Sequence, residues 1–271
     1  SHAAELLAEE NRPPGRDRLN RIIRDNAKRL DRMVKDVREL NRRDRVQAEP
    51  VRLAAFLETF VDDLVQNEGY RREAEVIHPP VDVDFYVPGS DGRGEEYLAV
   101  SRLVGYKRVD LLVQAFRDDL PDRRLVVVGE GPERVRLQAM AGPNVSFAGR
   151  LAPDALRERL QRARAFLFAA VEDFGIAPVE AMACGTPVIA YGRGGAAETV
   201  AGLEAPAPTG VLFAEQTATG VAGAVRTFEE NAQRITPQAC RARAERFSAA
   251  RFRAQFTDFV TRKTAEWQQR R

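Results

Sequence analysis

Two adjacent segments, Ala165-Phe-Leu-Phe168 and Glu172-Asp-Phe-Gly-Ile-Ala-Pro-Val-Glu180, decide the fold. The first is a short apolar run of the kind that forms a buried strand. In the second, Pro178 suits the first turn of a helix, so we expect a helix to begin there. Glu172 would then lie on the loop and Glu180 in the first helical turn. A strand, a loop and a helix in this order are typical of an α/β protein.

The same alternation extends on both sides of this unit. From about residue 70 onward, short runs rich in β-branched residues alternate with helical stretches, which predicts an open, largely parallel α/β sheet. The expected strands are Glu75–His78, Tyr97–Ser101, Leu125–Val128, Val145–Phe147, Ala165–Phe168, Pro187–Tyr191 and Gly210–Phe213. The expected helices are Val109–Phe116, Pro132–Ala141, Asp154–Ala163, Pro178–Cys184 and Ala197–Val200.

Residues 1–69 have a different pattern and are expected to form a separate α-helical unit. Between Arg16 and Leu40, apolar residues recur every three or four positions, which predicts one long amphipathic helix with coiled-coil character. Asn26 occupies the polar position of that seam, where such a residue can fix register or oligomeric state. A second amphipathic stretch runs from Leu53 to Val65. We therefore expect a helical hairpin followed by one more helix.

The composition excludes several classes of function. The chain has 42 basic and 40 acidic residues and a net charge of +2, so we expect no nucleic-acid partner. Cys184, Cys240 and the two histidines show no metal-ligand spacing, so we expect no metal site and two free thiols. No apolar run approaches the ~20 residues that span a bilayer, and we expect a cytoplasmic location.

In parallel sheets, ligands bind where strands end and loops lead into helices. Arg102 and Lys107 follow the strand expected at Tyr97–Ser101, and such cations suit a diphosphate. The turn Gly129-Glu-Gly-Pro132 follows the next strand, and its default interpretation is structural, with Pro132 in the first turn of a helix. The loop Gly192-Arg-Gly-Gly-Ala-Ala-Glu-Thr199 would offer backbone N–H groups to an anion.

Glu172 and Glu180 are the most informative side chains at these strand ends. Both carboxylates could face one crevice beside a helix N-terminus, which attracts phosphate. Carboxylates are also good acceptors for sugar hydroxyls. From the residues alone, the alternative is that each glutamate is simply exposed or caps a helix.

Several segments that occur in order resemble the C-terminal domain of family 4 (group 1) glycosyltransferases, which have the GT-B fold. They are Val76-Ile-His-Pro-Pro-Val-Asp82, Ser101-Arg-Leu103, Tyr106-Lys-Arg-Val-Asp110, Gly129-Glu-Gly-Pro132, Phe147-Ala-Gly-Arg-Leu151 and Glu172–Gly185. The resemblance covers residues 70–271, and the segment that begins at Glu172 is its most specific part. It implies a Rossmann-like sheet that forms the C-terminal half of a GT-B fold.

The resemblance implies roles for matching positions. Arg102 and Lys107 would bind the donor diphosphate and stabilise charge on the leaving group, and Glu172 would contact hydroxyls of the transferred sugar, which makes these three the implied catalytic residues. The implied donor-binding residues are Gly131, Arg150, Leu151, Phe174, Gly175, Ile176, Ala177 and Glu180. Of these, Glu180 would hold the ribose, residues 150–151 would frame the base, and the amides of 175–177 would face the phosphates.

The family also implies retention of anomeric configuration, no metal and no cofactor. Its motifs favour GDP-mannose as the donor, with a UDP-sugar as the alternative, and a saccharide or lipid-linked acceptor. Members carry a first Rossmann domain that binds the acceptor and usually supplies a histidine; no such domain is recognised in residues 1–69, so activity of the chain alone is left open. We expect His78 to have a packing or linker role rather than to replace that histidine.

Three segments resemble the dimerisation helices of a sensor histidine kinase, namely Ser1–Leu7, Ile22–Leu30 and Val37–Arg43. The matched part is the one that follows the phosphoacceptor histidine of that family. The chain is therefore interpreted as a chimera, whether a natural gene fusion, an assembly error or an engineered chain. Three functions follow: a glycosyltransferase or its donor-binding half, a signalling or dimerisation module, and a non-catalytic nucleotide-sugar binder. A homodimer through the N-terminal helices and peripheral membrane association are further expectations.

Overall fold

The computed structural model describes residues 75–90 and 92–269. The expected helical hairpin, its coiled-coil seam and the domain boundary near residue 70 lie outside the described residues. The account below therefore concerns the α/β unit alone.

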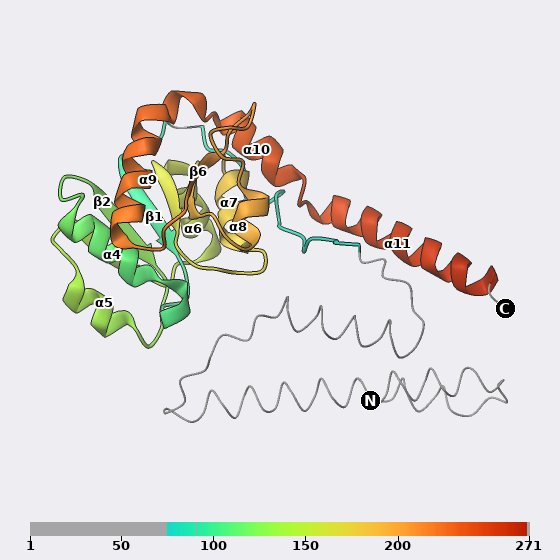
Figure 1. Cartoon of the computed structure of the whole chain (residues 1–271), viewed down its shortest axis with the longest axis horizontal. Coiled ribbons are helices and arrows are strands. Elements are labelled where there is room, and N and C mark those ends of the chain that lie inside the picture. The colour runs from blue at the N-terminus through green and yellow to red at the C-terminus, as the bar shows by residue number, and fades with distance from the viewer. Residues whose placement is uncertain (1–74, 91, 270–271) are drawn as a thin grey trace. The chain divides into compact units, whose positions relative to one another are not determined.

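Six parallel strands form one sheet, which confirms the expected α/β fold (Figure 1). They are β1 (Glu96–Val100), β2 (Arg124–Val128), β3 (Val145–Gly149), β4 (Ala165–Phe168), β5 (Val188–Tyr191) and β6 (Gly210–Phe213). Their spatial order is β3-β2-β1-β4-β5-β6, and every neighbouring pair is parallel. Strands β2 and β3 are added on one side of β1, and β4, β5 and β6 are added on its other side. The topological switch point therefore lies between β1 and β4. At such a switch point the loops diverge at the carboxyl ends of the strands and leave a crevice.

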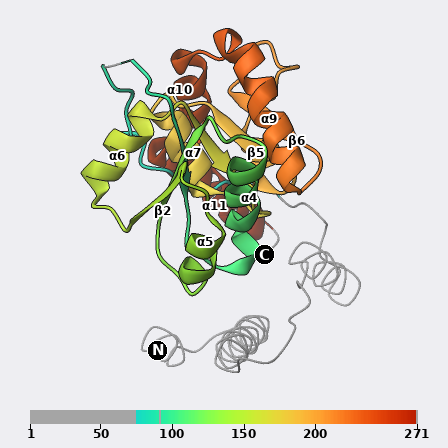
Figure 2. The same ribbon diagram turned by 90° about the vertical axis from the view of Figure 1, so that its left-hand side faces the viewer.

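Helices cover both faces of the sheet (Figure 2). One layer consists of α4 (Val109–Asp118), α5 (Arg134–Met140) and α9 (Ala218–Asn231), and the other includes α6 (Pro153–Arg162), α7 (Ile176–Ala183), α8 (Gly195–Thr199) and α10 (Pro237–Glu245). Two 3-10 turns, η1 (Gly105–Lys107) and η2 (Ala232–Arg234), and the long C-terminal helix α11 (Ala249–Gln269) complete the described elements. Within the described residues, no helix is long and apolar enough to cross a membrane.

Two interior strands, β4 and β5, explain why the sheet is stable. Every residue of β4 and β5 is buried, because each strand has helices on both faces. On one face, Met182 of α7 is almost fully inaccessible beside these strands, and in the other layer Phe116 packs against Tyr97 of β1. Apolar burial of this kind supplies the main driving force for folding.

The structure corrects several expected element boundaries, of which two bear on the site. The segment Glu75–His78 is not a strand: Val76 is 74% exposed, and the nearest pairing is a single bridge between Val81 and Ser248. Helix α7 begins at Ile176 rather than Pro178, because Gly175 (φ 79°) turns the chain into the helix two residues earlier. Pro178 is tolerated there, since the first N–H groups of a helix have no internal acceptor.

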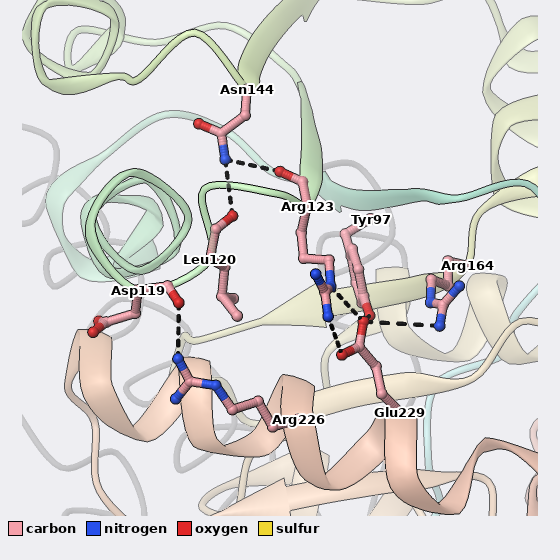
Figure 3. Close-up of polar contacts among 8 residues, drawn as sticks. All are labelled: Tyr97, Asp119, Leu120, Arg123, Asn144, Arg164, Arg226 and Glu229. Carbon is pink, nitrogen blue, oxygen red and sulfur yellow. Dashed lines mark hydrogen bonds and ion pairs between the residues drawn. The ribbon is translucent and has the colours of Figure 1, made fainter.

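A polar network ties the amino-terminal ends of the strands to α9 (Figure 3). Arg123 donates two hydrogen bonds to Glu229, of 2.8 and 3.0 Å, and the buried Tyr97 hydroxyl donates a third of 2.9 Å. Arg164 approaches the same carboxylate to 3.8 Å. Beside it, the Asn144 amide donates to the carbonyl oxygen of Leu120. Glu229 is thus held by two residues of this network, whereas the buried Nε of Arg164 has no hydrogen-bond partner among the described residues.

Candidate active site

A cleft of about 1140 Å³ opens at the carboxyl ends of the strands around the switch point. Its walls come from the loops that follow β1, β2, β3 and β4, as the sheet topology predicts. All the site residues predicted from the sequence line it, namely Arg102, Lys107, Gly131, Arg150, Leu151, Glu172, Phe174, Gly175, Ile176, Ala177 and Glu180. The structure thus brings the predicted residues together, while their roles stay predictions.

The loop after β1 supplies two cations. Arg102 is exposed and has no ion-pair partner among the residues that the structure describes. Lys107 ends the turn η1, and its ammonium forms an ion pair with the Glu172 carboxylate and lies 5.1 Å from the centre of the Tyr106 ring. The next residue, Arg108, adopts φ 52° and is bonded to Asp110, which fixes the chain at the start of α4.

The turn after β2 packs tightly against that loop. The Leu103 amide donates to the carbonyl oxygen of Glu130 at 2.9 Å, and the Glu133 amide donates to the Leu103 carbonyl at 3.1 Å. A Cβ on Gly131 would lie 2.2 Å from the Leu103 carbonyl oxygen, so only glycine allows this approach. Pro132 lies in the turn before α5 rather than in its first helical turn, which corrects the expectation.

The loop after β4 presents Glu172 and the start of α7. No side-chain oxygen caps this helix, so its first amides are available to an acceptor in the cleft. Phe174 lines the cleft but is only 8% exposed. Its ring lies 5.6 Å from that of His78 and 5.3 Å from that of Phe247. The position of His78 agrees with the expected packing role, and Phe174 mainly supports the loop.

The glycine-rich loop at residues 192–199 has a different role from the one expected. It does not line the cleft, and the Gly195 amide is bonded to the Glu172 carbonyl at 2.7 Å. A Cβ on Gly195 would lie 2.3 Å from the Phe174 Cα. The glycines therefore let this loop support the Glu172 loop from behind, instead of offering amides to an anion.

Glu180 is the most buried of the predicted carboxylates. Because α7 starts early, it begins the second helical turn, not the first, and still lines the cleft. Burial raises the pKa of Glu180, and the nearby Tyr86 hydroxyl opposes that shift. Burial and the nearby Glu180 raise the pKa of Tyr86 to about 12. Tyr86 was not predicted, because nothing in the sequence connects it with a residue so distant along the chain.

The loop after β3 completes the cleft with Arg150, which is exposed, and Leu151, which is partly buried. Nearby, Glu130 lines the cleft and forms an ion pair with Arg134. Asp173, like Glu130, is a cleft carboxylate that the sequence did not single out. The cleft thus carries both cations and hydrogen-bond acceptors, as a ligand with a diphosphate and several hydroxyls requires.

The two thiols lie away from solvent, as expected. Cys184 and Cys240 are free and buried, and burial raises the pKa of each to about 12. Within the described part of the chain, no group of three or more His, Cys, Asp or Glu side chains is placed to hold a metal ion.

Curated relatives match part of the α/β unit. A D-inositol 3-phosphate glycosyltransferase from Mycobacteroides abscessus is 37% identical over 150 residues, which are 47% of this chain and 33% of that protein. A GDP-mannose-dependent alpha-(1-6)-phosphatidylinositol monomannoside mannosyltransferase from Mycolicibacterium smegmatis is 35% identical over 153 residues, 46% of this chain and 40% of that protein. The chain thus matches less than half the length of these relatives.

Solved structures share the fold. A sucrose-phosphate synthase from Thermosynechococcus elongatus superposes with a TM-score of 0.62 and 24% identity, over 76% of this chain and 57% of that one. Anabaena Alr3699/HepE, in complex with UDP and glucose, gives a TM-score of 0.61 and 23% identity, over 74% and 60%. Residues 82–247 match the family described as Glycosyl transferases group 1, and by this match the chain belongs to that family.

Proposed function

We propose that residues 75–269 form the donor-binding domain of a retaining glycosyltransferase that takes a hexose from a nucleotide sugar. The observation that carries this proposal is the convergence of two cations and two carboxylates in one cleft at the switch point of the sheet. Arg102 and Lys107 approach from the loop after β1, while Glu172 and Glu180 approach from β4 and α7.

The charges suggest how the domain acts. In the described structure Lys107 is neutralised by Glu172, whereas Arg102 has no charged partner among the described residues. A bound diphosphate would sit near both cations and the amides of α7, and Lys107 would turn from Glu172 to the phosphate. The cations and helix dipole then stabilise the negative charge that develops on the leaving diphosphate. Glu172, once released, would accept hydrogen bonds from the sugar hydroxyls.

For the donor we propose GDP-mannose, with a UDP-sugar as the alternative. The names of two curated relatives specify GDP-mannose, whereas solved structures of similar fold contain UDP. For the acceptor we propose a saccharide or a lipid-linked sugar. Since the matched region is well under half of the curated relatives, we propose that transfer requires a further domain that binds this acceptor.

Location and assembly are also proposals. We place the protein in the cytoplasm, in peripheral contact with a membrane, and as a homodimer through residues 1–69. The alternative functions are a nucleotide-sugar binder without turnover and a dimerisation module derived from a histidine kinase. The partial match to the curated relatives favours the former of these two.

Isothermal titration calorimetry on the full chain tests the proposal. Wild type is expected to bind GDP, UDP or their sugars, also in EDTA, and Glu180→Ala should weaken binding about tenfold or more through loss of hydrogen bonds to a charged group. Glu230→Ala, an exposed glutamate on α9, is the matched control and should bind as wild type does. Failure of wild type to bind any of these ligands would refute the proposal, and release of GDP from GDP-mannose separates an enzyme from a binder.

A further inference from the structure

Two oppositely charged side chains of the cleft are bonded to each other. The Lys107 ammonium, at the end of η1, forms an ion pair with the Glu172 carboxylate on the loop after β4, and both side chains line the cleft. Arg102, on the same loop as Lys107, has no ionic partner among the described residues. The fold therefore commits one of the two cations proposed for the diphosphate to an internal carboxylate.

Both members of the pair are partly shielded from solvent. The side chain of Lys107 is 16% exposed and that of Glu172 is 24% exposed. The ammonium also lies 5.1 Å from the centre of the Tyr106 ring, at the distance of a cation–π contact. Partly buried charges are screened less by salt than exposed pairs are. A diphosphate that binds to Lys107 therefore has to compete with Glu172.

We propose that Glu172 is an internal competitor of the diphosphate, so that the cleft holds a nucleotide sugar more tightly than the nucleoside diphosphate left after transfer. The inference rests on the proposed function. With a nucleotide sugar, the diphosphate takes Lys107 and the hexose hydroxyls donate to Glu172, so both charged groups gain new partners. A nucleoside diphosphate offers Glu172 no hexose hydroxyls. Glu172 then re-forms its ion pair with Lys107, and the diphosphate keeps one cation fewer.

The same competition would assist product release. Once the hexose has left, Glu172 recaptures Lys107 and the remaining diphosphate is held mainly by Arg102 and the amides of α7. Differences in affinity between related complexes arise mostly in the dissociation rate. The ion pair should therefore speed the release of GDP or UDP.

The same loop offers a matched control. Asp173 is adjacent to Glu172, is exposed, lines the cleft and has no ionic partner in the part of the chain that the structure describes. Glu172→Gln and Asp173→Asn each remove one negative charge from the cleft and keep the shape of the side chain. Only Glu172→Gln frees Lys107, so an effect of net charge alone should appear in both variants.

Calorimetry on the full chain tests the competition. GDP, GDP-mannose, UDP and UDP-glucose are titrated into wild type, Glu172→Gln and Asp173→Asn. Glu172→Gln should bind the nucleoside diphosphate about five- to tenfold more tightly than wild type, the effect of one partly exposed charged contact. Wild type should prefer the nucleotide sugar to the diphosphate, and Glu172→Gln should lose that preference. Asp173→Asn should keep the preference and change each affinity by about twofold at most.

Two further comparisons connect the effect with Lys107. In a Lys107→Met background, Glu172→Gln should gain no more affinity than Asp173→Asn does in wild type, because no ammonium is left to free. Glu172→Ala should show the same gain as Glu172→Gln, so the result does not depend on the new amide or on the folding of one variant. Surface plasmon resonance should show the nucleoside diphosphate leaving Glu172→Gln about five- to tenfold more slowly than wild type.

The outcomes distinguish the two proposals. If wild type binds none of the four ligands, the proposed function fails and the inference fails with it. If wild type binds a nucleoside diphosphate and neither Glu172 variant binds it more tightly, only the competition is refuted. An equal gain in Asp173→Asn, or an equal gain in the absence of Lys107, would also refute it, because the effect would then come from net charge.

Discussion

Replacement of Gly195 by alanine should damage the cleft from behind. The added Cβ would lie 2.3 Å from the Phe174 Cα, 2.4 Å from its carbonyl oxygen and 2.6 Å from the Asp173 carbonyl oxygen. Carbon atoms make optimal contact at about 3.5–4.0 Å, so the two backbones must separate by about 1 Å. All three contacts are with backbone atoms, which cannot rotate away as a side chain could. The Glu172 loop must therefore move.

The steric cost of the added Cβ is partly offset by the higher helix propensity of alanine. Overpacking of this kind destabilises by about 1–3 kcal/mol, whereas alanine in place of helical glycine stabilises by at most about 1 kcal/mol. Gly195→Ala should therefore lose about 1–2 kcal/mol in urea unfolding. Nucleotide affinity should fall about tenfold or more, because the clash at Asp173 and Phe174 displaces the start of α7, whose amides would face the phosphates.

Gly223→Ala is the matched control for this experiment. Gly223 is an exposed residue inside α9, and a Cβ there meets nothing within 4 Å. This variant should gain about 0.5–1 kcal/mol through helix propensity and bind nucleotide as wild type does. If Gly195→Ala is stabilised to the same extent and keeps its affinity, the inference that the glycine-rich loop supports Glu172 is wrong.

Two further predictions concern the charged groups. Lys107→Met should weaken nucleotide diphosphate binding about tenfold or more in calorimetry, since it removes a charge-assisted contact; unchanged affinity would exclude Lys107 from the phosphate site. Glu229→Gln should lower the free energy of urea unfolding by about 1–3 kcal/mol at pH 7. The hydrogen bond from Arg123 lowers the pKa of Glu229 in the folded state. The stabilisation that ionised Glu229 provides is therefore fully present above the ordinary pKa of a glutamate. It is lost as the pH falls through the lowered pKa of the folded state. Wild type and variant should converge once the pH is below that lowered pKa, and a constant difference would contradict the pKa shift.

Strands were predicted well from the sequence where a short apolar run lies inside the sheet. Ala165–Phe168 and Gly210–Phe213 have the expected bounds, because each is a short apolar run at the sheet. The same kind of run at Glu75–His78 failed, since β-branched residues favour extended backbone but cannot provide a neighbouring strand. Helices α9, α10 and α11 were not predicted. The apolar residues of α11 include exposed Phe256 and Val260 and do not mark a core face.

In the site, residues that belong to a local sequence motif were predicted, whereas residues that the fold brings in from distant segments were not. Arg102, Lys107, Glu172 and Glu180 were predicted because each stands at a strand end or in a recognisable motif. The role of Gly195 was misjudged, because a glycine that admits a ligand and a glycine that admits another backbone give the same pattern. Tyr86 could not be predicted, because Glu180 is brought near it only by the folded arrangement of the segment before β1.

The two ends of the sheet differ in how their charged side chains are paired. At the amino-terminal end, Glu229 receives three hydrogen bonds, two from Arg123 and one from Tyr97. At the carboxyl end, among the described residues, Arg102 has no ionic partner, and α7 has no side-chain cap. Unsatisfied groups lower stability, while groups bonded to each other stabilise a fold. A free cation and uncapped amides are what a ligand site requires, and this explains why Gly195, which supports the loop at the carboxyl end, should affect binding.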